Sequence, residues 1–430
     1  MKKTLYFFLR FFARRVLNKY KPVIIGITGS VGKSSTKEAI YVALEDSINS
    51  RRSLKNYNNE IGVPLTILGR LSPGKNVVGW LRVFWMSIGS IIFPEKSYPK
   101  VLILEMAADR LGDIEYLINM APLDRGVITA ISPAHTEFLG SLESISKEKQ
   151  ILVTDLHPSG WAILNADDKI VMAMKEKISA RIITFGLSAE ADVQAIEISL
   201  DQALENDRIQ IRGLRFKINH QGSIVPVFLP NIISVTQIYA VLAAVATAIT
   251  FELNLIEIVE ALKEYKPLPG RLVPIEGINN SLIIDDTYNS SPQAVQSALE
   301  TLAKIKIHSA EAKKWVILGD MLELGYLTKE AHVEVGKRVA QMNFDYLITI
   351  GAGGQEIANS AKRSRMGKDN IFSFENSEQA LEFLKEKIKK GDLLLIKGSQ
   401  SMHLEQIVKG IMLKPRRAKK LLVRQTEEWR

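Results

Sequence analysis

The sequence predicts an α/β fold of two units, the first of them built on a mainly parallel sheet. Short apolar runs alternate with helical patterns from Val23 to Lys177, and the same rhythm restarts after Arg271. This alternation is typical of parallel strands with helices on both faces of the sheet. A length of 430 residues is also too great for a single core and suits two or three domains.

The expected elements of the first unit follow one another as strand–helix pairs. Four pairs are predicted: Val23–Ile27 with a helix from Ser34, Val101–Glu105 with Gly112–Met120, Gly126–Ile131 with Ser144–Leu156, and Trp161–Asn165 with Lys169–Lys177. Residues 181–230 lose the helical rhythm and predict short strands in an antiparallel annex. Helices at Tyr239–Ile249 and Leu255–Tyr265 close the unit.

A linker is predicted at Lys266–Arg271, where two prolines and a glycine discourage helix continuation. Strands then recur at Ser281–Asp285, Trp315–Leu318, Tyr346–Gly351 and Leu393–Lys397. We therefore divide the chain into an amphipathic helix at 1–21, a first domain at 22–265, a second domain at 266–412 and a basic tail at 413–430.

The composition narrows the class of protein. Hydrophobic residues make up 46% of the chain and charged residues 24%, which is typical of a folded, soluble protein. The chain has no cysteine, which excludes disulfides, thiolate zinc sites and thiol nucleophiles, and fits a reducing, cytoplasmic compartment. A metal ion would need oxygen ligands or one of six histidines.

The net charge of +9 is carried by the two ends of the chain. Residues 1–21 hold seven Lys or Arg and no acid, and residues 414–430 hold seven Lys or Arg against two Glu, which leaves about −3 for the body. No zinc-finger spacing or aromatic RNA-binding signature lies between them. The sequence therefore argues against a nucleic-acid partner.

The N-terminal segment has lysines before an apolar stretch, but it does not fit a signal peptide. Arg10, Arg14 and Arg15 interrupt the apolar stretch, and no small-residue cleavage site follows. The pattern predicts a basic amphipathic helix instead. Its Phe and Leu side chains either lie on an anionic surface at the inner face of the membrane or pack on the first domain.

Residues Asn76–Phe93 form the most apolar segment of the chain. Its uninterrupted stretch is short for a bilayer and contains Arg82. We therefore expect a buried or interfacial helix rather than a span, with Trp80 and Trp85 as candidate membrane-facing side chains.

The turn Gly26–Thr36 concentrates glycines, a lysine and hydroxyls between the first strand and the first helix. In such a turn the backbone N–H groups point at a triphosphate, Lys33 reaches the β- and γ-phosphates, and Ser34 binds Mg²⁺. The general pattern G-x-x-x-x-G-K-[ST] needs glycine where this chain has Ile27. The alternative is an ordinary glycine-rich turn, which the strand–loop–helix context argues against.

Two further candidate site residues are expected at the carboxyl edge of the first sheet. Glu105 ends one predicted strand, and His135 lies in the loop after another. The carboxyl ends of parallel strands meet at one edge of the sheet, and carboxylate and hydroxyl oxygens suit Mg²⁺. An ordinary strand-end acid and a surface histidine are the alternative interpretations.

Several segments form a set of motifs in a fixed order: Thr28–Ser35, Asn56–Pro64, Leu104–Asp109, Ala134–Glu143, Asp285–Pro292, Leu318–Gly325 and Lys397–Ser399. This set resembles the Mur ligases, which join an amino acid or peptide to a nucleotide-linked muramyl acceptor. The resemblance spans roughly residues 22–410. Within the family it is strongest to MurF, the UDP-N-acetylmuramoyl-tripeptide:D-alanyl-D-alanine ligase.

The resemblance implies an ATP- and Mg²⁺-dependent amide ligase of peptidoglycan precursor synthesis. It implies a central P-loop ATPase domain and a C-terminal Rossmann-like domain that closes over it. The substrates would be a UDP-muramyl peptide and D-Ala-D-Ala, with an acyl phosphate as intermediate. MurF proteins normally also carry an N-terminal UDP-binding domain, which we expect to be absent because only about 21 residues precede the first strand. We expect a monomer.

The resemblance also implies individual roles. Nucleotide contacts are expected from Thr28, Gly29, Ser30, Val31, Gly32, Lys33, Ser34, Ser35, Gln237, Arg271, Asp286, Tyr288 and Asn289. Catalytic roles are expected for Lys33, His135, Lys149 and Arg271, and metal ligation for Ser34, Glu105, His135 and a carbamylated Lys149. Substrate contacts are expected from Asn56, Asn58, Asn59, Asp320, Glu323, Lys397 and Ser399. The alternatives are a helix-capping turn for Asp286, Tyr288 and Asn289, and surface-loop roles for Asp320, Glu323, Lys397 and Ser399.

Two positions depart from the family pattern. Where the family usually has A-K-G-E-I, this chain has Glu148-Lys-Gln-Ile151. Lys147, two residues before Lys149, is therefore an alternative candidate for the carbamylated lysine. A solvated helix face is the other interpretation of these charged residues. The family's G-x-H-N-x-x-N-A is replaced by Ser234–Ala240. Gln237 would replace one amide, and the second asparagine is missing, which leaves the contacts to the base open.

Three functions are compatible with these features. The first is a MurF-like ligase, and the second keeps the chemistry with another acceptor, as in ligases of the cyanophycin or polyglutamate type. The third is a membrane-associated P-loop protein that uses nucleotide as a switch. A switch has no need of Lys33, Glu105, His135 and Arg271 together, so their combined presence argues against the third function.

Overall fold

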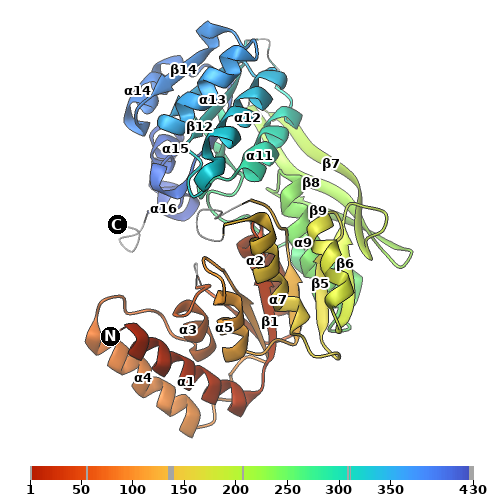
Figure 1. The fold of residues 1–430 in the computed structure, drawn as a ribbon. Helices are drawn as coiled ribbons and strands as arrows, with labels where there is room; N and C mark the ends of the chain where they lie inside the picture. The colour runs from red at the N-terminus through yellow and green to blue at the C-terminus, as the bar shows by residue number, and fades with distance from the viewer. Residues whose placement is uncertain are drawn as a thin grey trace.

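Two α/β units, each with its own sheet, make up the chain in the computed structural model (Figure 1). The structure describes residues 2–54, 57–133, 140–205, 208–307, 309 and 311–425. The predicted site residues Asn56 and His135 lie outside these ranges.

The first sheet has nine strands in the order β2-β3-β1-β4-β5-β6-β7-β8-β9. Neighbours from β2 to β7 are parallel, and β8 and β9 continue the sheet antiparallel. The strands are β1 (Val23–Thr28), β2 (Ser50–Arg52), β3 (Val101–Glu105), β4 (Arg125–Ile128), β5 (Trp161–Asn165), β6 (Arg181–Gly186), β7 (Val193–Glu205), β8 (Arg208–His220) and β9 (Ser223–Pro230).

Helices cover both faces of this sheet, as the alternation of strands and helices predicts. Successive side chains of β1 point to opposite faces, so Ile25 and Ile27 enter one core and Ile24 enters the other. The helices of this unit are α1 (Lys2–Tyr20), α2 (Lys33–Glu45), α3 (Gly62–Leu68), α4 (Val77–Ile92), α5 (Asp113–Met120), α7 (Leu142–Thr154), α8 (Lys169–Ala173), α9 (Val235–Ile249) and α10 (Leu255–Leu262).

Two expectations for this unit are corrected. The strands predicted as a short antiparallel annex are long, since β7 and β8 have 13 residues each, and they extend the main sheet. They are antiparallel as expected. The helix expected at Lys169–Lys177 is α-helical only to Ala173 and continues as a 3-10 turn.

The second unit has six strands in the order β10-β11-β15-β12-β13-β14, all parallel except β10. Its strands are β10 (Val273–Glu276), β11 (Leu282–Asp286), β12 (Lys314–Gly319), β13 (Tyr346–Ile350), β14 (Ile371–Phe374) and β15 (Leu393–Lys397). Its helices are α11 (Pro292–Lys304), α12 (Thr328–Gln341), α13 (Ala352–Arg363), α14 (Ser377–Lys387), α15 (Glu405–Ile411) and α16 (Ala418–Leu421).

The segment that follows residue 412 is folded onto this second unit as far as residue 425, although its charge marked it as a tail. Ala418, Leu422 and Val423 are buried, and the first two join the core beneath α15. Arg424 is also buried and pairs with Glu405. The exposed part of this segment carries its other basic residues, Lys414, Arg416, Arg417, Lys419 and Lys420.

The first helix packs on the first unit through one face. Leu9, Ala13, Val16 and Leu17 of α1 are buried in the core that also holds β3 and α3. The helix predicted at Asn76–Phe93 is α4, but it is not buried, since only Val83 and Ser87 are inaccessible. Among the residues that the structure describes, no helix is both long and apolar enough to cross a bilayer.

Candidate active site

The turn between β1 and α2 has the backbone that the glycine spacing predicts. Gly32 is the N-cap of α2 with φ 88°, and Gly29 has φ 150°. A Cβ at Gly29 would lie 2.0 Å from Thr129 Oγ1, so only glycine fits there. The N-terminus of α2 and its free N–H groups are thereby brought to the carboxyl edge of the sheet, where they can bind phosphate.

The residues after β4 hold this turn in place. Ser30 N donates to Ala130 O at 2.7 Å, Ser30 Oγ donates to Ser132 O at 2.9 Å, and Thr129 Oγ1 donates to Val31 O at 2.6 Å. The turn is thus fixed by backbone carbonyls and one side chain of the segment that follows β4, and not by its own sequence alone. Of the other predicted nucleotide contacts here, Thr28 is fully buried and Ser35 O accepts from Tyr265 at 3.4 Å.

Lys33 lies within the turn and points back over it. Its Nζ donates to Gly29 O at 2.6 Å, at the place where a phosphate chain would follow the backbone. Burial lowers the pKa of Lys33, Glu105 acts in the opposite direction, and the positive charge of Arg271 lowers it further. The charges that influence Lys33 thus include a cation of the second unit.

Ser34 and Glu105 form the candidate metal pair. Ser34 Oγ donates to Glu105 Oε1 at 3.1 Å, and the carboxylate is only 2% exposed. Glu105 Oε2 has no hydrogen-bond partner, and it lies 3.5 Å from Lys37 Nζ. A buried carboxylate oxygen without a donor, next to a hydroxyl, fits a hard cation such as Mg²⁺. In the described ranges no three His, Asp or Glu side chains group into a metal site, so the fit rests on this pair.

Asn58, expected to contact the substrate, lies beside the candidate metal ligand Glu105. Its Nδ2 donates to Glu105 Oε1 at 3.1 Å, and its backbone carbonyl accepts from Ala107 N at 2.9 Å. The side chain therefore orients the candidate metal ligand. Metal ligands in proteins are usually held in this way by hydrogen bonds from neighbouring residues.

Lys149 is a buried lysine on α7, 3% exposed. Burial lowers its pKa to about 7, and the charge of Lys33 adds to this effect, while Glu148 and Asp109 oppose it. A lysine with this pKa is half neutral at physiological pH, and only the neutral amine reacts with CO₂ to form a carbamate. The burial and lowered pKa of Lys149 are thus compatible with the carbamate predicted for it.

The two neighbours of Lys149 in the motif have other roles. Lys147 is 70% exposed and pairs with Glu143 at 2.7 Å along the outer face of α7. Glu148 is buried and accepts from Gly112 N and Ile114 N, at 2.9 and 2.8 Å, which caps the N-terminus of α5. Of the two lysines that the sequence left open, only Lys149 faces inward.

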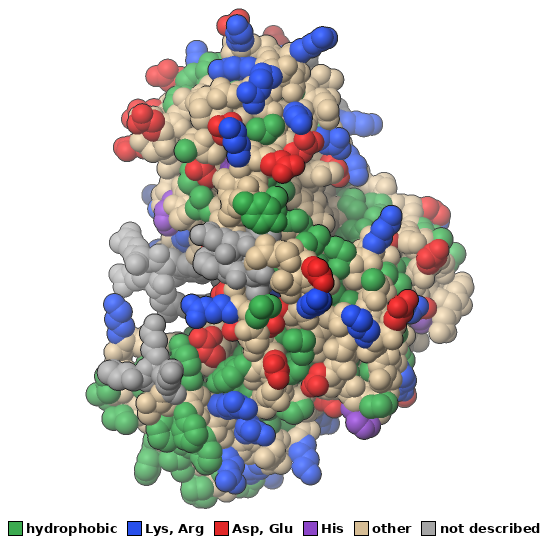
Figure 2. Space-filling view, in the orientation of Figure 1, with side chains coloured by type: hydrophobic (Ala, Val, Ile, Leu, Met, Phe, Trp, Pro, Cys, Tyr) green, Lys and Arg blue, Asp and Glu red, His purple; other side chains and the backbone are tan. Residues whose placement is uncertain are grey.

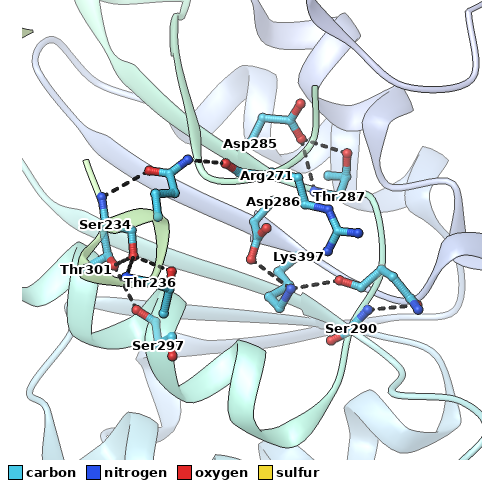
Figure 3. Close-up of polar contacts among 12 residues, drawn as sticks. Ser234, Thr236, Arg271, Asp285, Asp286, Thr287, Ser290, Ser297, Thr301 and Lys397 are labelled. Carbon is cyan, nitrogen blue, oxygen red and sulfur yellow. Dashed lines mark hydrogen bonds and ion pairs between the residues drawn. The ribbon is translucent and has the colours of Figure 1, made fainter. Parts of the chain in front are cut away.

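In the second unit, Asp286 and Lys397 form a buried ion pair (Figure 3). Their charged atoms are 2.7 Å apart, and Lys397 Nζ also donates to Asn289 O at 2.8 Å. Burial raises the pKa of Asp286 and lowers that of Lys397, and the pairing offsets part of both shifts. Lys397 was expected to contact the incoming dipeptide, but it is 1% exposed, so we correct its role to holding the Asp286–Asn289 loop.

Arg271 lies beside the same loop, with its guanidinium carbon 4.0 Å from the centre of the Tyr288 ring. Gln237 Nε2 donates to Arg271 O at 2.9 Å, and Gln237 Oε1 accepts from Ile233 N and Ser234 N. Both the nitrogen and the oxygen of the Gln237 amide thus have backbone partners, and the residue is 6% exposed. We therefore correct the expected nucleotide contact of Gln237: it caps α9 and fixes the hinge that carries Arg271.

Three other candidates for substrate contact have local partners. Asn59 Oδ1 accepts from Ile61 N and Gly62 N at the start of α3. Asp320 Oδ1 accepts from Gly354 N at 2.8 Å, near the start of α13, and Ser399 Oγ accepts from Leu322 N at 2.9 Å. These contacts shape the loops that carry the three side chains. Glu323 is exposed, with φ 64°, and extends from the same loop as Asp320.

Sequence analysis did not identify Lys37, His332 and Arg424. Lys37 is one helical turn after Lys33, and this i, i+4 spacing on α2 was a signal that could have placed it beside Glu105. His332 is buried and accepts from Met321 N at 2.9 Å, which ties α12 to the loop of Asp320. Nothing in the sequence marks Arg424, which donates to Thr287 O at 2.6 Å, and its partner Glu405 is 19 residues away.

Comparisons with known proteins agree with this arrangement. The Mur ligase middle domain matches residues 91–248, and the glutamate ligase domain of Mur ligases matches residues 270–400. The UDP-N-acetylmuramoyl-tripeptide–D-alanyl-D-alanine ligase of Bacillus subtilis is 29% identical over 403 residues, which cover 94% of this chain and 79% of that protein.

Solved structures give the same result. MurF from Thermotoga maritima in complex with ADP superimposes with a TM-score of 0.73 and 25% identity, covering 94% of this chain and 82% of that one. MurF from Acinetobacter baumannii has a TM-score of 0.76 at 23% identity, covering 93% and 79%. The chain therefore belongs to the Mur ligase family, whose members are ATP-dependent amide ligases.

Proposed function

We propose that this ligase uses ATP to join D-Ala-D-Ala, through its amino group, to the terminal carboxylate of a UDP-muramyl tripeptide. The names of the relatives support the choice of substrates. The observation that carries the chemistry is the contact between Ser34 and Glu105 beside the turn that holds Lys33. The electrostatic influence of Lys33 on the buried Lys149, and of Arg271 on Lys33, supports a shared site.

The reaction has two steps. A carboxylate oxygen of the muramyl peptide attacks the γ-phosphorus of ATP, the bond to the β-phosphate oxygen breaks, and ADP leaves. The amine of the dipeptide then attacks the acyl phosphate carbon, loses a proton and displaces inorganic phosphate. Both steps build negative charge on phosphate or carbonyl oxygens, so positioned cations lower the barriers.

We assign each candidate residue a role in these two steps from its position in the structure. Lys33 would neutralise the β- and γ-phosphates, and Arg271 would approach them from the second unit. Ser34, Glu105 and a carbamylated Lys149 would hold Mg²⁺, with His135 as the further ligand implied by the family resemblance. Mg²⁺ supplies charge neutralisation and alignment of the phosphates when it is bound. Asp286, Tyr288 and Asn289 would line the nucleotide side of the second domain.

We assign residues 22–265 to the ATP-binding domain and residues 266–412 to the domain that closes over it, in line with the matched segments. We also propose that the enzyme acts as a monomer in the cytoplasm, where its nucleotide substrates are made. A peripheral contact with the inner face of the membrane is argued separately below.

A substrate screen tests the proposal. The purified chain is given ATP, Mg²⁺ and one acceptor, either a UDP-muramyl tripeptide or a polyglutamate or cyanophycin primer, together with the matching amine. ADP release and the mass of the product are followed. We expect ADP and amide product only with the UDP-muramyl tripeptide and D-Ala-D-Ala. The Lys33→Ala variant should lose at least a hundredfold in turnover, because it lacks a cation on the transferred phosphoryl group.

Two other outcomes would overturn the proposal in different ways. Product with a polyglutamate or cyanophycin acceptor alone would keep the ligase chemistry and replace the substrate. ADP release that no acceptor stimulates, with no amide formed, would favour a nucleotide switch instead.

A further inference from the structure

The outer sides of α1 and α4 together form an exposed apolar surface, which we call the α1–α4 face. Figure 2 shows hydrophobic side chains gathered over these two helices, with Lys and Arg side chains beside them. The face consists of Phe7, Phe8 and Phe11 from α1 and of Val77, Val78, Leu81, Trp85, Met86, Ile88, Ile92 and Phe93 from α4 and its C-cap. Large contiguous apolar surfaces of this kind usually mark an interaction site.

The pattern along α4 shows that this exposure is organised. Val78, Leu81, Trp85, Ile88 and Ile92 recur at spacings of three and four residues, so they form one stripe along the helix. Trp85 is 75% exposed and Val78 is 73% exposed. The stripe points away from the protein while the opposite side of α4, with Val83 and Ser87, packs inward.

The two helices are fixed to each other, so the face is preformed. Phe84 of α4 contacts Phe8 and Phe12 of α1, with ring centroids 5.8 and 5.6 Å apart. Lys19 Nζ donates to the carbonyls of Ser90, Ile91 and Phe93 at 3.1, 2.9 and 2.7 Å, which caps the C-terminus of α4. Rearrangement of α1 to cover the stripe would break this cap and expose the buried side of α1.

The exposed charges on the two helices themselves are all positive. Neither α1 nor α4 contains an Asp or Glu. Arg14 and Arg15 of α1, Arg82 of α4 and the adjoining Lys75 and Lys96 are exposed, and the one exposed acid in the turn after α4 is Glu95. Apolar side chains bordered by cations match the interfacial region of an anionic bilayer, where acyl chains lie beneath negative headgroups.

We propose that the α1–α4 face binds the surface of an anionic membrane, with both helices lying in the plane of the headgroups. The stripe of α4 and the phenylalanines of α1 enter the acyl boundary, and the arginines pair with lipid phosphates. This orientation is consistent with Figure 1, which places α1 and α4 at the end of the molecule away from the second unit. Membrane binding therefore leaves the second unit free to move over the ATP site.

Vesicle co-sedimentation of the full chain tests the proposal. Vesicles of phosphatidylcholine with about a third phosphatidylglycerol are compared with pure phosphatidylcholine vesicles at low and high salt. We expect binding to the anionic vesicles that falls at least tenfold in the Leu81→Asp/Trp85→Asp variant, and at least tenfold in the Arg14→Glu/Arg15→Glu variant. The second loss should be larger at low salt, since screening weakens attraction between charges.

The matched control variants carry the same kinds of substitution outside the α1–α4 face. Ile256→Asp alters an apolar side chain that is 64% exposed on α10, and Lys385→Glu/Lys389→Glu makes the same charge change on the second unit. Both controls should bind vesicles like the unmodified chain. Circular dichroism and ligase turnover with soluble substrates should be unchanged in every variant, which separates this test from the fate of the proposed function.

Two results would overturn the inference. Equal binding by the Leu81→Asp/Trp85→Asp variant would show that the face is not the site of contact. If the chain instead sediments as a dimer that this variant dissociates, and binds no vesicles, the α1–α4 face is an interface between two copies of the chain.

Discussion

The hydroxyl of Ser34 donates a hydrogen bond of 3.1 Å to Oε1 of Glu105, and so joins the start of α2 to the end of β3. The two residues are 71 positions apart in the sequence. They meet because β1 and β3 pair in parallel, with Ile27 opposite Glu105, which brings the carboxyl end of β3 beside the turn that follows β1. A carboxylate and a hydroxyl thus face the space next to the phosphate turn.

This contact predicts how the enzyme depends on Mg²⁺. Replacement of Glu105 by Gln should raise the Mg²⁺ concentration needed for half-maximal turnover, because an ionised ligand is lost. Replacement of Asn58 by Ala should raise it about tenfold, since Asn58 orients Glu105. Turnover is measured across a Mg²⁺ titration, with the exposed Glu115→Gln as the control. An Asn58→Ala variant that changes only the KM of the muramyl peptide would return Asn58 to the substrate site.

The buried Lys149 predicts a pH-dependent carbamate. Its pKa of about 7 means that the amine is neutral above that pH and protonated below it. CO₂ adds to the neutral amine, so modification of the metal-free protein by ¹³C-labelled bicarbonate should rise as the pH passes through about 7. Nuclear magnetic resonance of the labelled carbon measures this rise, and Lys149→Ala should abolish the signal.

The matched variant for that prediction is Lys147→Ala, which removes an exposed amine two residues away. It should retain both the carbamate signal and turnover, whereas Lys149→Ala should be inactive and partly rescued by short-chain carboxylates. A labelled carbamate that persists in Lys149→Ala but disappears in Lys147→Ala would reverse the assignment.

Asp285 predicts a dependence of stability on pH. Burial raises its pKa to about 7, partly opposed by hydrogen bonds from Thr287, so the folded state holds a proton that the unfolded state releases near pH 4. This contribution is fully present below about pH 4 and is lost as the pH rises through about 7. Asp285→Asn cannot ionise, so its Tm should exceed that of the unmodified chain by several degrees at pH 8.

At pH 5 the difference in Tm should be clearly smaller than at pH 8, because the folded Asp285 is then largely protonated and only the unfolded chain has released its proton. Calorimetric scans at both pH values provide the comparison. A difference in Tm of the same size at pH 5 and pH 8 would show that the substitution acts through packing and not through ionisation.

Arg424 predicts that the C-terminal segment stabilises the second unit. It is 2.7 Å from Glu405, which is fully buried, and it donates to the carbonyl of Thr287. Arg424→Met would leave the buried Glu405 carboxylate without its permanent cation, with only the His403 ring beside it, and should destabilise the unit by about 3–5 kcal/mol. Urea unfolding measures the loss, with the exposed Arg416→Met as the control.

A double variant separates the ion pair from simple packing. Arg424→Met/Glu405→Leu removes both charges, so it should regain most of the stability lost in Arg424→Met. An equal loss in the single and double variants would mean that the contact to Thr287, rather than the pair, carries the effect.

The sequence determined the α/β class, the phosphate turn and the order of the motifs, because these depend on local patterns. Apolar runs and glycine spacing act over a few residues, and a parallel sheet brings its strand ends together whatever fills the loops. The sequence alone therefore predicted that Ser34 and Glu105 share one site, and the two side chains are in contact in the structure.

Only the tertiary structure decided which polar residues are buried and which partners they have. Gln237 and Lys397 were expected to meet ligands, yet both are enclosed by backbone groups and a counter-charge from distant segments. Lys147 and Lys149 are alike in sequence, and the side of α7 on which each lies separates them. Likewise, α1 and α4 form one apolar surface only because Phe84, Phe8 and Phe12 pack together across about 70 residues of chain, and such long-range packing has no local signal.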